Sequence, residues 1–322
     1  MTTPVPHWPG RMVELTSGQR VWLAETPAAD RELVLLVHGM SGAATNWTDL
    51  MAALAPDFDC TALDLPGSGF SPPPKSWSRY SVSAQAGTVI RLIEALTTDS
   101  DHPGPVHLVG NSMGGAVSVR IAARRPDLVK TLTLVSPAMP DLKVPRSVMH
   151  FPLLALPFVG ERLVRLWAQR YPVENRVAGV FATCFADPSR LHPERFAAEV
   201  EALRRRDALS HEPASLVGAA RTLVVETLRP APLSLWRAAG RVTAPCLVLF
   251  GQHDRLVHPQ LADRATRVFR DARVLVLSDT GHLGQMERPG LVAALFREMV
   301  AETRDRGEDA GNSGRRDPVD AR

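Results

Sequence analysis

A serine between two glycines lies where a nucleophile could act, at the junction of a predicted strand and a predicted helix. An apolar run ends in Gly110-Asn111-Ser112-Met113-Gly114, and the residues after it have helical character. A sharp strand-to-helix turn crowds the backbone, so glycines at these two positions remove side chains that would clash. The turn also aims the first N–H groups of the helix at whatever the serine attacks, and these groups favour negative charge. The pattern therefore predicts Ser112 as a nucleophile.

A serine hydroxyl is a weak nucleophile at neutral pH and needs a base, which in turn needs an orienting group. In open α/β sheets such groups gather at the carboxyl ends of strands. Asp254 follows the apolar run 247–250, and His282 follows the run 274–277. Asp141, which comes after an earlier strand, is the alternative acid. The predicted constellation is Ser112, Asp254 and His282, in that order along the chain.

Other polar residues near the predicted strand ends fit structural roles better than catalytic ones. His253 and His258 are interpreted as loop histidines beside the site. His38 lies in a glycine-containing turn, which its ring would brace, and His107 is a sheet residue. Asp64 follows a strand, where its carboxylate is expected to accept hydrogen bonds from neighbouring backbone.

Strands and helices alternate through the first 135 residues, and the alternation resumes after residue 245. The predicted strands cover residues 12–15, 20–25, 33–37, 60–63, 106–110, 131–135, 246–250 and 274–277. The first two flank Ser17-Gly18 and are predicted to form a β-hairpin. The later spacing is typical of βα units, which predicts an α/β fold with a mostly parallel eight-stranded sheet and helices on both faces.

The middle of the chain interrupts this alternation. Residues 139–233 are helical and loop-like without a buried strand, which predicts a helical cap inserted after the sixth strand. The core domain is then expected at residues 12–138 and 234–303. The last helix is predicted at 291–303, and residues 304–322, rich in charge and glycine, are predicted to be a disordered tail.

Composition narrows the function classes. A chain of 322 residues with 45% hydrophobic and 22% charged residues is typical of a soluble globular protein. The net charge of +3 is scattered, without a basic run interleaved with aromatics, which argues against a nucleic-acid partner. Neither a signal-peptide pattern nor an apolar stretch of membrane-spanning length is seen, so a cytoplasmic location is expected. Cys60, Cys184 and Cys246 lie far apart and predict neither a metal site nor a disulfide.

From about residue 12 to 303 the chain resembles the α/β-hydrolase superfamily. The resemblance rests on five segments in order: His38-Gly39-Met40, Asp64-Leu65-Pro66-Gly67-Ser68-Gly69, Gly110-Asn111-Ser112-Met113-Gly114-Gly115, Gly251-Gln252-His253-Asp254 and Gly281-His282. Five matches in the same order are far more specific than any single one. Ser112 also disfavours epoxide hydrolases and haloalkane dehalogenases, which use aspartate at this position.

The resemblance implies a role for each matching residue. Ser112 would be the nucleophile, His282 the general base and then the acid, and Asp254 the group that orients His282. The backbone N–H groups of Met40 and Met113 would form the oxyanion hole. Nothing in the sequence suggests a metal, a nucleotide or a prosthetic group as cofactor, and the implied mechanism needs only water as the second substrate.

Apolar residues between Phe151 and Trp167 indicate the substrate class, although most are expected to pack between cap and sheet. The rest would line a pocket for an apolar acyl or aromatic ester, or touch a lipid surface transiently. The expected function is therefore an esterase or lipase. Alternatives are a meta-cleavage-product C–C hydrolase, a cofactor-free haloperoxidase-like perhydrolase and a low-turnover small-molecule receptor. Ser41-Gly42-Ala43 and Leu283 depart from the C–C hydrolase pattern. The oligomeric state stays open.

Overall fold

Eight strands form one sheet in the computed structural model, which describes residues 7–98, 102–141, 143, 145–156 and 158–313. The strands are β1 (Gly10–Glu14), β2 (Arg20–Glu25), β3 (Leu33–Val37), β4 (Asp59–Leu63), β5 (Val106–Asn111), β6 (Val129–Val135), β7 (Cys246–Gly251) and β8 (Ala272–Leu277). Their order across the sheet is β1-β2-β4-β3-β5-β6-β7-β8. Strand β2 runs antiparallel to β1 and β4, and the other neighbouring pairs are parallel. The predicted hairpin and the mostly parallel eight-stranded sheet are both confirmed.

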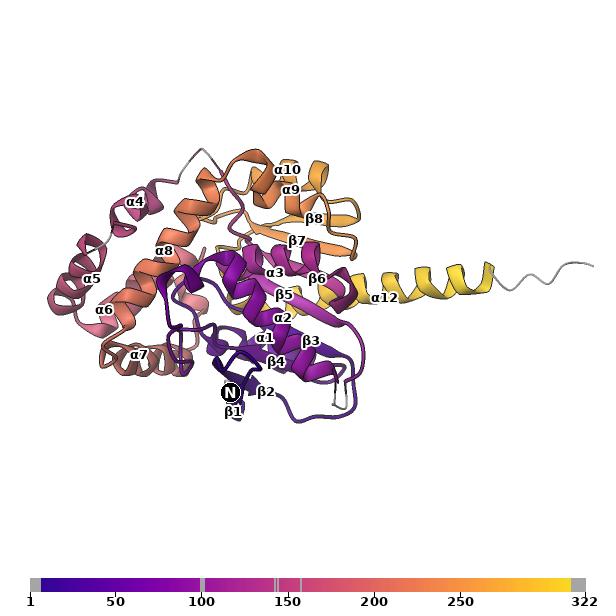
Figure 1. The fold of residues 1–322 in the computed structure, drawn as a ribbon, viewed down its shortest axis with the longest axis horizontal. Helices are drawn as coiled ribbons and strands as arrows, with labels where there is room; N and C mark the ends of the chain where they lie inside the picture. Colours follow the sequence, from indigo (N-terminus) through magenta and orange to yellow (C-terminus); the bar gives the residue numbers. More distant parts are fainter. Residues whose placement is uncertain (1–6, 99–101, 142, 144, 157, 314–322) are drawn as a thin grey trace, which may run out of the picture.

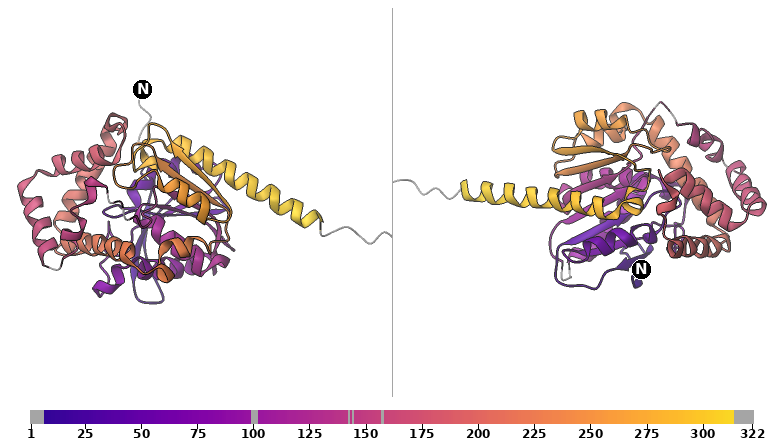
Figure 2. Two further views of the ribbon diagram at one scale, coloured as in Figure 1. Left: turned by 90° about the horizontal axis from the view of Figure 1, so that it is seen from above. Right: turned by 180° about the vertical axis from the view of Figure 1, so that it is seen from behind.

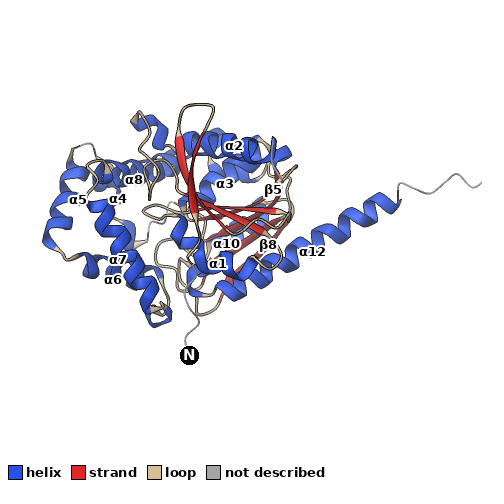
Figure 3. Cartoon of the chain, turned by 90° about the horizontal axis from the view of Figure 1, so that it is seen from below, coloured by secondary structure: helices blue, strands red, loops and turns tan. Residues whose placement is uncertain are grey.

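Helices cover both faces of the sheet, as predicted (Figures 1 and 3). The core helices are α1 (Thr48–Leu54), α2 (Val82–Thr98), α3 (Met113–Arg124), α9 (Leu235–Ala239), α10 (Leu261–Val268), α11 (Gly284–Glu287) and α12 (Pro289–Ser313). Every residue of β3 is buried, because its alternate side chains enter two different layers. Leu35 and Val37 belong to the apolar cluster that includes α2 and α3. Val34 and Leu36 belong to the cluster that includes α1 and α12.

Between β6 and β7 the described residues form helices and no strand, and we call residues 139–233 the helical insertion. Its α-helices are α4 (Phe151–Leu154), α5 (Val159–Arg170), α6 (Val173–Cys184), α7 (Pro193–Asp207) and α8 (Glu212–Leu228). Helices α4 to α7 stand to one side of the sheet (Figures 1 and 2). Helix α8 is tied to the core by a buried ion pair of 2.8 Å between Arg120 of α3 and Glu226. No helix in the described part of the chain combines the length and the apolar character needed to cross a lipid bilayer.

The last helix is longer than predicted. Helix α12 continues past Thr303 to Ser313 and projects from the body of the protein (Figure 1), so the predicted disordered tail is wrong for residues 304–313. Two ion pairs tether this part of the helix to the sheet: Arg304 contacts Glu32 at 2.7 Å and Arg306 contacts Asp271 at 3.0 Å. Arg304 and Arg306, two of the charges that suggested disorder, therefore have partners in the fold. Residues 314–322 lie outside the described residues.

Candidate active site

Ser112 lies at the turn between β5 and α3 with φ 53° and ψ −120°. Non-glycine residues rarely adopt positive φ, and such strain often marks a functional position. The two neighbouring glycines are required, as predicted from the sequence. A Cβ on Gly110 would lie 2.6 Å from the Gly114 carbonyl oxygen, and a Cβ on Gly114 would lie 2.1 Å from that of Val37. The serine is thus held in its strained position by close backbone packing.

His282 and Asp254 contact each other directly. The imidazole Nδ1 of His282 lies 2.8 Å from Oδ2 of Asp254. The other carboxylate oxygen, Oδ1, accepts the backbone N–H groups of Leu256 at 2.8 Å and Val257 at 2.9 Å. Burial alone would raise the pKa of Asp254, but the neighbouring His282 and these hydrogen bonds outweigh it and lower the pKa. Asp254 therefore stays ionised and can fix the orientation of the imidazole.

The alternative acid, Asp141, contacts a different histidine. Its Oδ2 lies 2.8 Å from Nδ1 of His258, and its Oδ1 accepts the backbone N–H of Lys143 at 2.9 Å. Both Asp141 and His258 line the cavity described below. The sequence left Asp254 and Asp141 as alternative acids. Among the described residues, only Asp254 contacts His282.

The backbone N–H groups of Met40 and Met113 are candidate donors close to Ser112. Across the described residues, neither takes part in a hydrogen bond outside the regular elements. The loop after β3 approaches the serine so closely that a Cβ on Gly39 would lie 2.9 Å from the Cβ of Ser112. Met113 opens helix α3, where the helix dipole favours negative charge. Both donors have the character that the predicted oxyanion hole requires.

A residue of the helical insertion holds the loop that carries Met40. Arg206 of α7 is buried, and its Nη1 donates to the Ser41 carbonyl oxygen at 2.7 Å. Ser41 has φ 59°, a left-handed conformation that its own side chain does not favour. The arginine therefore stabilises a strained residue directly after the candidate oxyanion donor. The sequence contained no signal for this contact, because the two residues are 165 positions apart.

His38 braces the same loop, as predicted. Its Nδ1 lies 2.7 Å from the Gly39 carbonyl oxygen, and its Nε2 accepts the Leu65 N–H at 3.0 Å. This pattern requires a neutral ring with the proton on Nδ1. Burial lowers the pKa of His38 to about 4, so the ring stays neutral at physiological pH.

Asp64 and His107 also have the predicted structural roles. Asp64 accepts the N–H of Ala44 at 2.7 Å and that of Phe70 at 2.8 Å. Burial raises the pKa of Asp64 to about 6, although these hydrogen bonds oppose the shift. His107 lies in β5 and hydrogen-bonds Thr131 of β6 at 2.8 Å. Neither residue faces the nucleophile's cavity, so neither competes with Asp254 or His282 for a catalytic role.

Sequence reasoning missed the residues that position the loop around His282. The side-chain amide of Asn111 donates to two carbonyl oxygens, that of Val135 at 3.0 Å and that of His282 at 3.1 Å. The backbone N–H of His282 donates to the Cys184 carbonyl at the end of α6, at 2.6 Å. Asn111 lies inside the serine motif, so its position could have suggested a role, but nothing in the sequence pointed to Cys184.

Glu287 is a second missed residue, and its side chain is fully buried. One carboxylate oxygen accepts the Gly281 N–H at 2.7 Å, and the other accepts the Asp187 N–H at 2.9 Å. Arg190 adds a contact at 3.4 Å. The carboxylate thereby joins the residue before His282 to the loop after α6.

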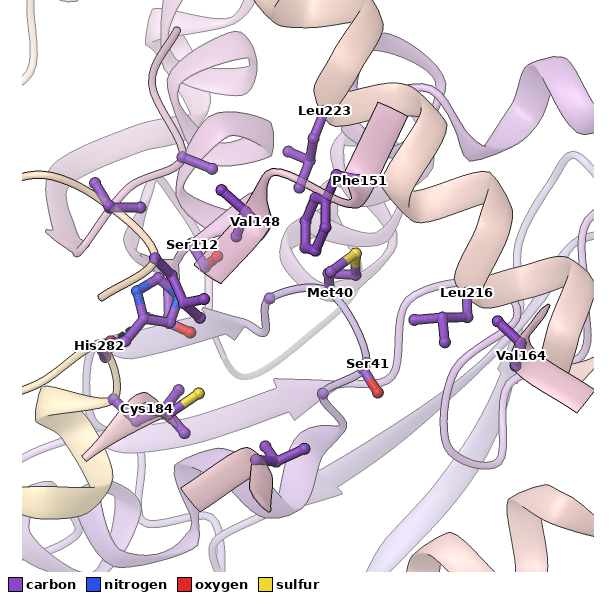
Figure 4. A pocket seen from close by; sticks show the side chains of 18 of the residues that line it. Met40, Ser41, Ser112, Val148, Phe151, Val164, Cys184, Leu216, Leu223 and His282 are labelled. Carbon is purple, nitrogen blue, oxygen red and sulfur yellow. Dashed lines mark hydrogen bonds between the residues drawn. The ribbon is translucent and has the colours of Figure 1, made fainter. Parts of the chain in front are cut away.

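Ser112 and His282 face one cavity of about 730 Å³ between the sheet and the helical insertion (Figure 4). Met40 and Asn111 contribute to its core side. Apolar side chains of the insertion line the other side, among them Val148, Phe151, Val164, Leu216 and Leu223. Among the described residues, no group of three histidine, cysteine or acidic side chains is placed to hold a metal ion. The cavity is large enough for a small apolar ligand beside the serine.

Comparison with known families agrees with this architecture. Residues 32–289 match the family model of the alpha/beta hydrolase fold. The chain belongs to the alpha/beta hydrolase family. The matched range includes the serine turn, both candidate partner residues and the helical insertion.

Several known hydrolases are similar to this one. Lipase 3 of Moraxella sp. (strain TA144) is 25% identical over 279 residues, covering 86% of this chain and 80% of the lipase. The pimeloyl-[acyl-carrier protein] methyl ester esterase of Neisseria meningitidis serogroup B / serotype 15 (strain H44/76) is 26% identical over 275 residues, covering 83% and 92%. A thermophilic esterase from Thermogutta terrifontis aligns in structure with a TM-score of 0.69 and 25% identity, covering 92% and 99%.

Proposed function

We propose that this hydrolase cleaves carboxylic esters with Ser112 as the nucleophile. His282 serves as general base and then as acid, and Asp254 orients it. The observation that carries the proposal is the 2.8 Å contact between Asp254 and His282, because His282 lines the cavity that Ser112 faces. The similarity to a lipase and to a methyl ester esterase also supports ester hydrolysis.

The proposed reaction proceeds through an acyl-enzyme. His282 Nε2 takes the proton of the Ser112 hydroxyl as its oxygen attacks the ester carbonyl carbon. The carbonyl oxygen becomes an oxyanion, which the N–H groups of Met40 and Met113 stabilise. The intermediate collapses as His282 returns the proton to the departing alcohol. A water molecule, deprotonated by His282, then attacks the acyl-enzyme and releases the acid, which restores the serine.

We further propose that residues 139–233 act as a cap that selects apolar substrates. The apolar lining between α4, α5 and α8 supports this assignment, because such a surface favours an acyl chain or an aromatic group over a hydrated one. Water serves as the second substrate, and the reaction needs no cofactor.

The test is hydrolysis of p-nitrophenyl esters of increasing acyl length by the full chain and by Ser112→Ala. Ser118→Ala is a matched control, since Ser118 lies in the same helix and its hydroxyl donates to the Gly114 carbonyl at 2.8 Å. We expect activity that peaks at one chain length, persists in Ser118→Ala and is lost in Ser112→Ala. Activity that survives in Ser112→Ala rejects the proposed nucleophile. Inactivity toward all esters, with turnover of a vinylogous diketone, assigns C–C bond hydrolysis instead.

A further inference from the structure

Large exposed apolar side chains are concentrated in α4, in α5 and in the residues that flank these two helices. Phe158 is 88% exposed and Met149 is 64% exposed. Phe158 also has φ 62°, a conformation that bulky residues rarely adopt. Further exposed apolar residues on this surface are Leu153, Leu156, Val159 and Leu166. Clustered exposure of this kind marks an interaction surface.

Basic residues are interspersed with these apolar side chains. Residues 143–171 contain five lysines and arginines and one glutamate, a local net charge of +4, whereas the whole chain carries +3. Arg146, Arg162, Arg165 and Arg170 are all exposed. None of the four forms an ion pair within the described part of the chain, although other arginines of the helical insertion do. Their charges are therefore available to a partner.

The place of this surface in the fold fits a role in substrate entry. Helices α4 and α5 lie at the edge of the molecule, away from the sheet, in each view of the ribbon (Figures 1 and 2). The same segment lines the cavity from inside through Val148, Phe151 and Val164. One short stretch thus forms an outer apolar surface and a wall of the cavity that holds Ser112.

We call the exposed apolar and basic residues of 146–156 and 158–170 the docking surface. We propose that the docking surface binds an anionic lipid surface. Apolar side chains that insert at the headgroup boundary, combined with arginines that attract anionic lipids, are the features of interfacial helices. A second copy of the chain fits less well. A two-fold dimer would place two surfaces of net charge +4 against each other, and like charges repel.

The docking surface would let an apolar ester pass from the lipid phase into the cavity. This benefit rests on the proposed ester hydrolysis, but docking itself does not and is measured separately. The expected affinity for a lipid surface can be worked out from the individual side chains. Each arginine near an anionic surface strengthens binding about fivefold. Insertion of a phenylalanine side chain strengthens binding about tenfold or more.

The experiment is flotation of the full chain with unilamellar vesicles of phosphatidylglycerol and phosphatidylcholine, or of phosphatidylcholine alone. We expect binding to the anionic vesicles that weakens as salt is raised. Phe158→Ser should weaken it about tenfold, and Arg162→Gln with Arg170→Gln about fivefold for each change. Matched controls lie far from the docking surface: Val276→Ser on the exposed edge of β8, and Arg241→Gln, also exposed. Both controls should bind like the unmodified chain.

Three outcomes overturn the proposal. The first is no binding to anionic vesicles, and the second is equal binding to both vesicle types. The third is a dimer in sedimentation that Phe158→Ser dissociates, which assigns the surface to a second copy of the chain. Hydrolysis of a short water-soluble p-nitrophenyl ester is measured in parallel and should be unchanged in Phe158→Ser. If the unmodified chain hydrolyses esters but does not bind anionic vesicles, docking alone is refuted. If the unmodified chain binds these vesicles but hydrolyses no ester, the proposed function alone is refuted.

Discussion

Replacing Asp254 with asparagine tests the proposed catalytic arrangement most directly. Oδ1 of Asp254 accepts two backbone N–H groups, so the asparagine oxygen must take that position. Its NH₂ group then faces Nδ1 of His282, where the native carboxylate oxygen lies at 2.8 Å. Nδ1 must accept that hydrogen bond, which moves the imidazole proton to Nε2. A ring protonated on Nε2 cannot take the proton of Ser112.

The expected loss in kcat for Asp254→Asn is about 10⁴-fold, the size seen when a triad histidine is held in the wrong tautomer. This corresponds to about 5 kcal/mol of transition-state stabilisation. The assay is kcat on the best p-nitrophenyl ester, with circular dichroism to verify that the variant is folded. Because the substitution preserves shape, the fold should persist.

Asp141→Asn is the matched control, because Asp141 also contacts a histidine on the cavity wall but not His282. It should change kcat by less than about tenfold, since it removes no interaction with the proposed base. The reasoning is refuted if Asp254→Asn retains more than a tenth of the activity. If instead Asp141→Asn loses most of it, Asp141 is the acid of the triad.

Three further predictions concern the supports of the site. Arg206→Met should lower kcat about tenfold with KM little changed, because it frees the loop at Ser41. This loss is a fraction of the effect of deleting an oxyanion donor. A change confined to KM in steady-state kinetics argues against this role. Glu287→Gln should lower the free energy of unfolding in urea by about 2 kcal/mol, since its amide leaves one of the two buried N–H donors unpaired; an unchanged midpoint contradicts it. The folded-state pKa of His38, about 4, lies below the ordinary value of 6.5, so its contribution to stability is complete above pH 6.5 and is lost as the pH falls toward 4. The free energy of unfolding in urea should fall by about 2 kcal/mol between pH 7.5 and pH 5 in the unmodified chain. This fall should be absent in His38→Gln. An equal fall in that variant would assign the effect to other groups.

The parts of the fold that local sequence determines were predictable. The fully apolar run of β3 predicts a strand buried on both faces, and the glycines around Ser112 are required by clashes with neighbouring backbone. The same local logic identified Asp254 and His282, because each follows a strand at the same edge of the sheet. The contact between them agrees with that expectation.

The missed features depend on contacts between residues far apart in the chain. Arg206 reaches Ser41 across 165 positions, and Glu287 reaches Asp187 across 100. A glutamate in a helix and an arginine in an insertion are usually solvated, so their types carried no signal of burial. Helix α12 was predicted too short for the same reason, since the ion pairs of its last part involve Glu32 and Asp271.

The hydrogen bond between the His282 N–H and the Cys184 carbonyl limits how this enzyme can be re-engineered or diversified. A Cβ on Gly281 would lie 2.2 Å from that same carbonyl oxygen, so the end of α6 packs directly on the backbone that carries the proposed base. The helical insertion is therefore not a detachable module. An insertion transplanted from another hydrolase would have to present a carbonyl group at this point. A version with the helices deleted would lose the support of the histidine along with one wall of the cavity that Ser112 faces.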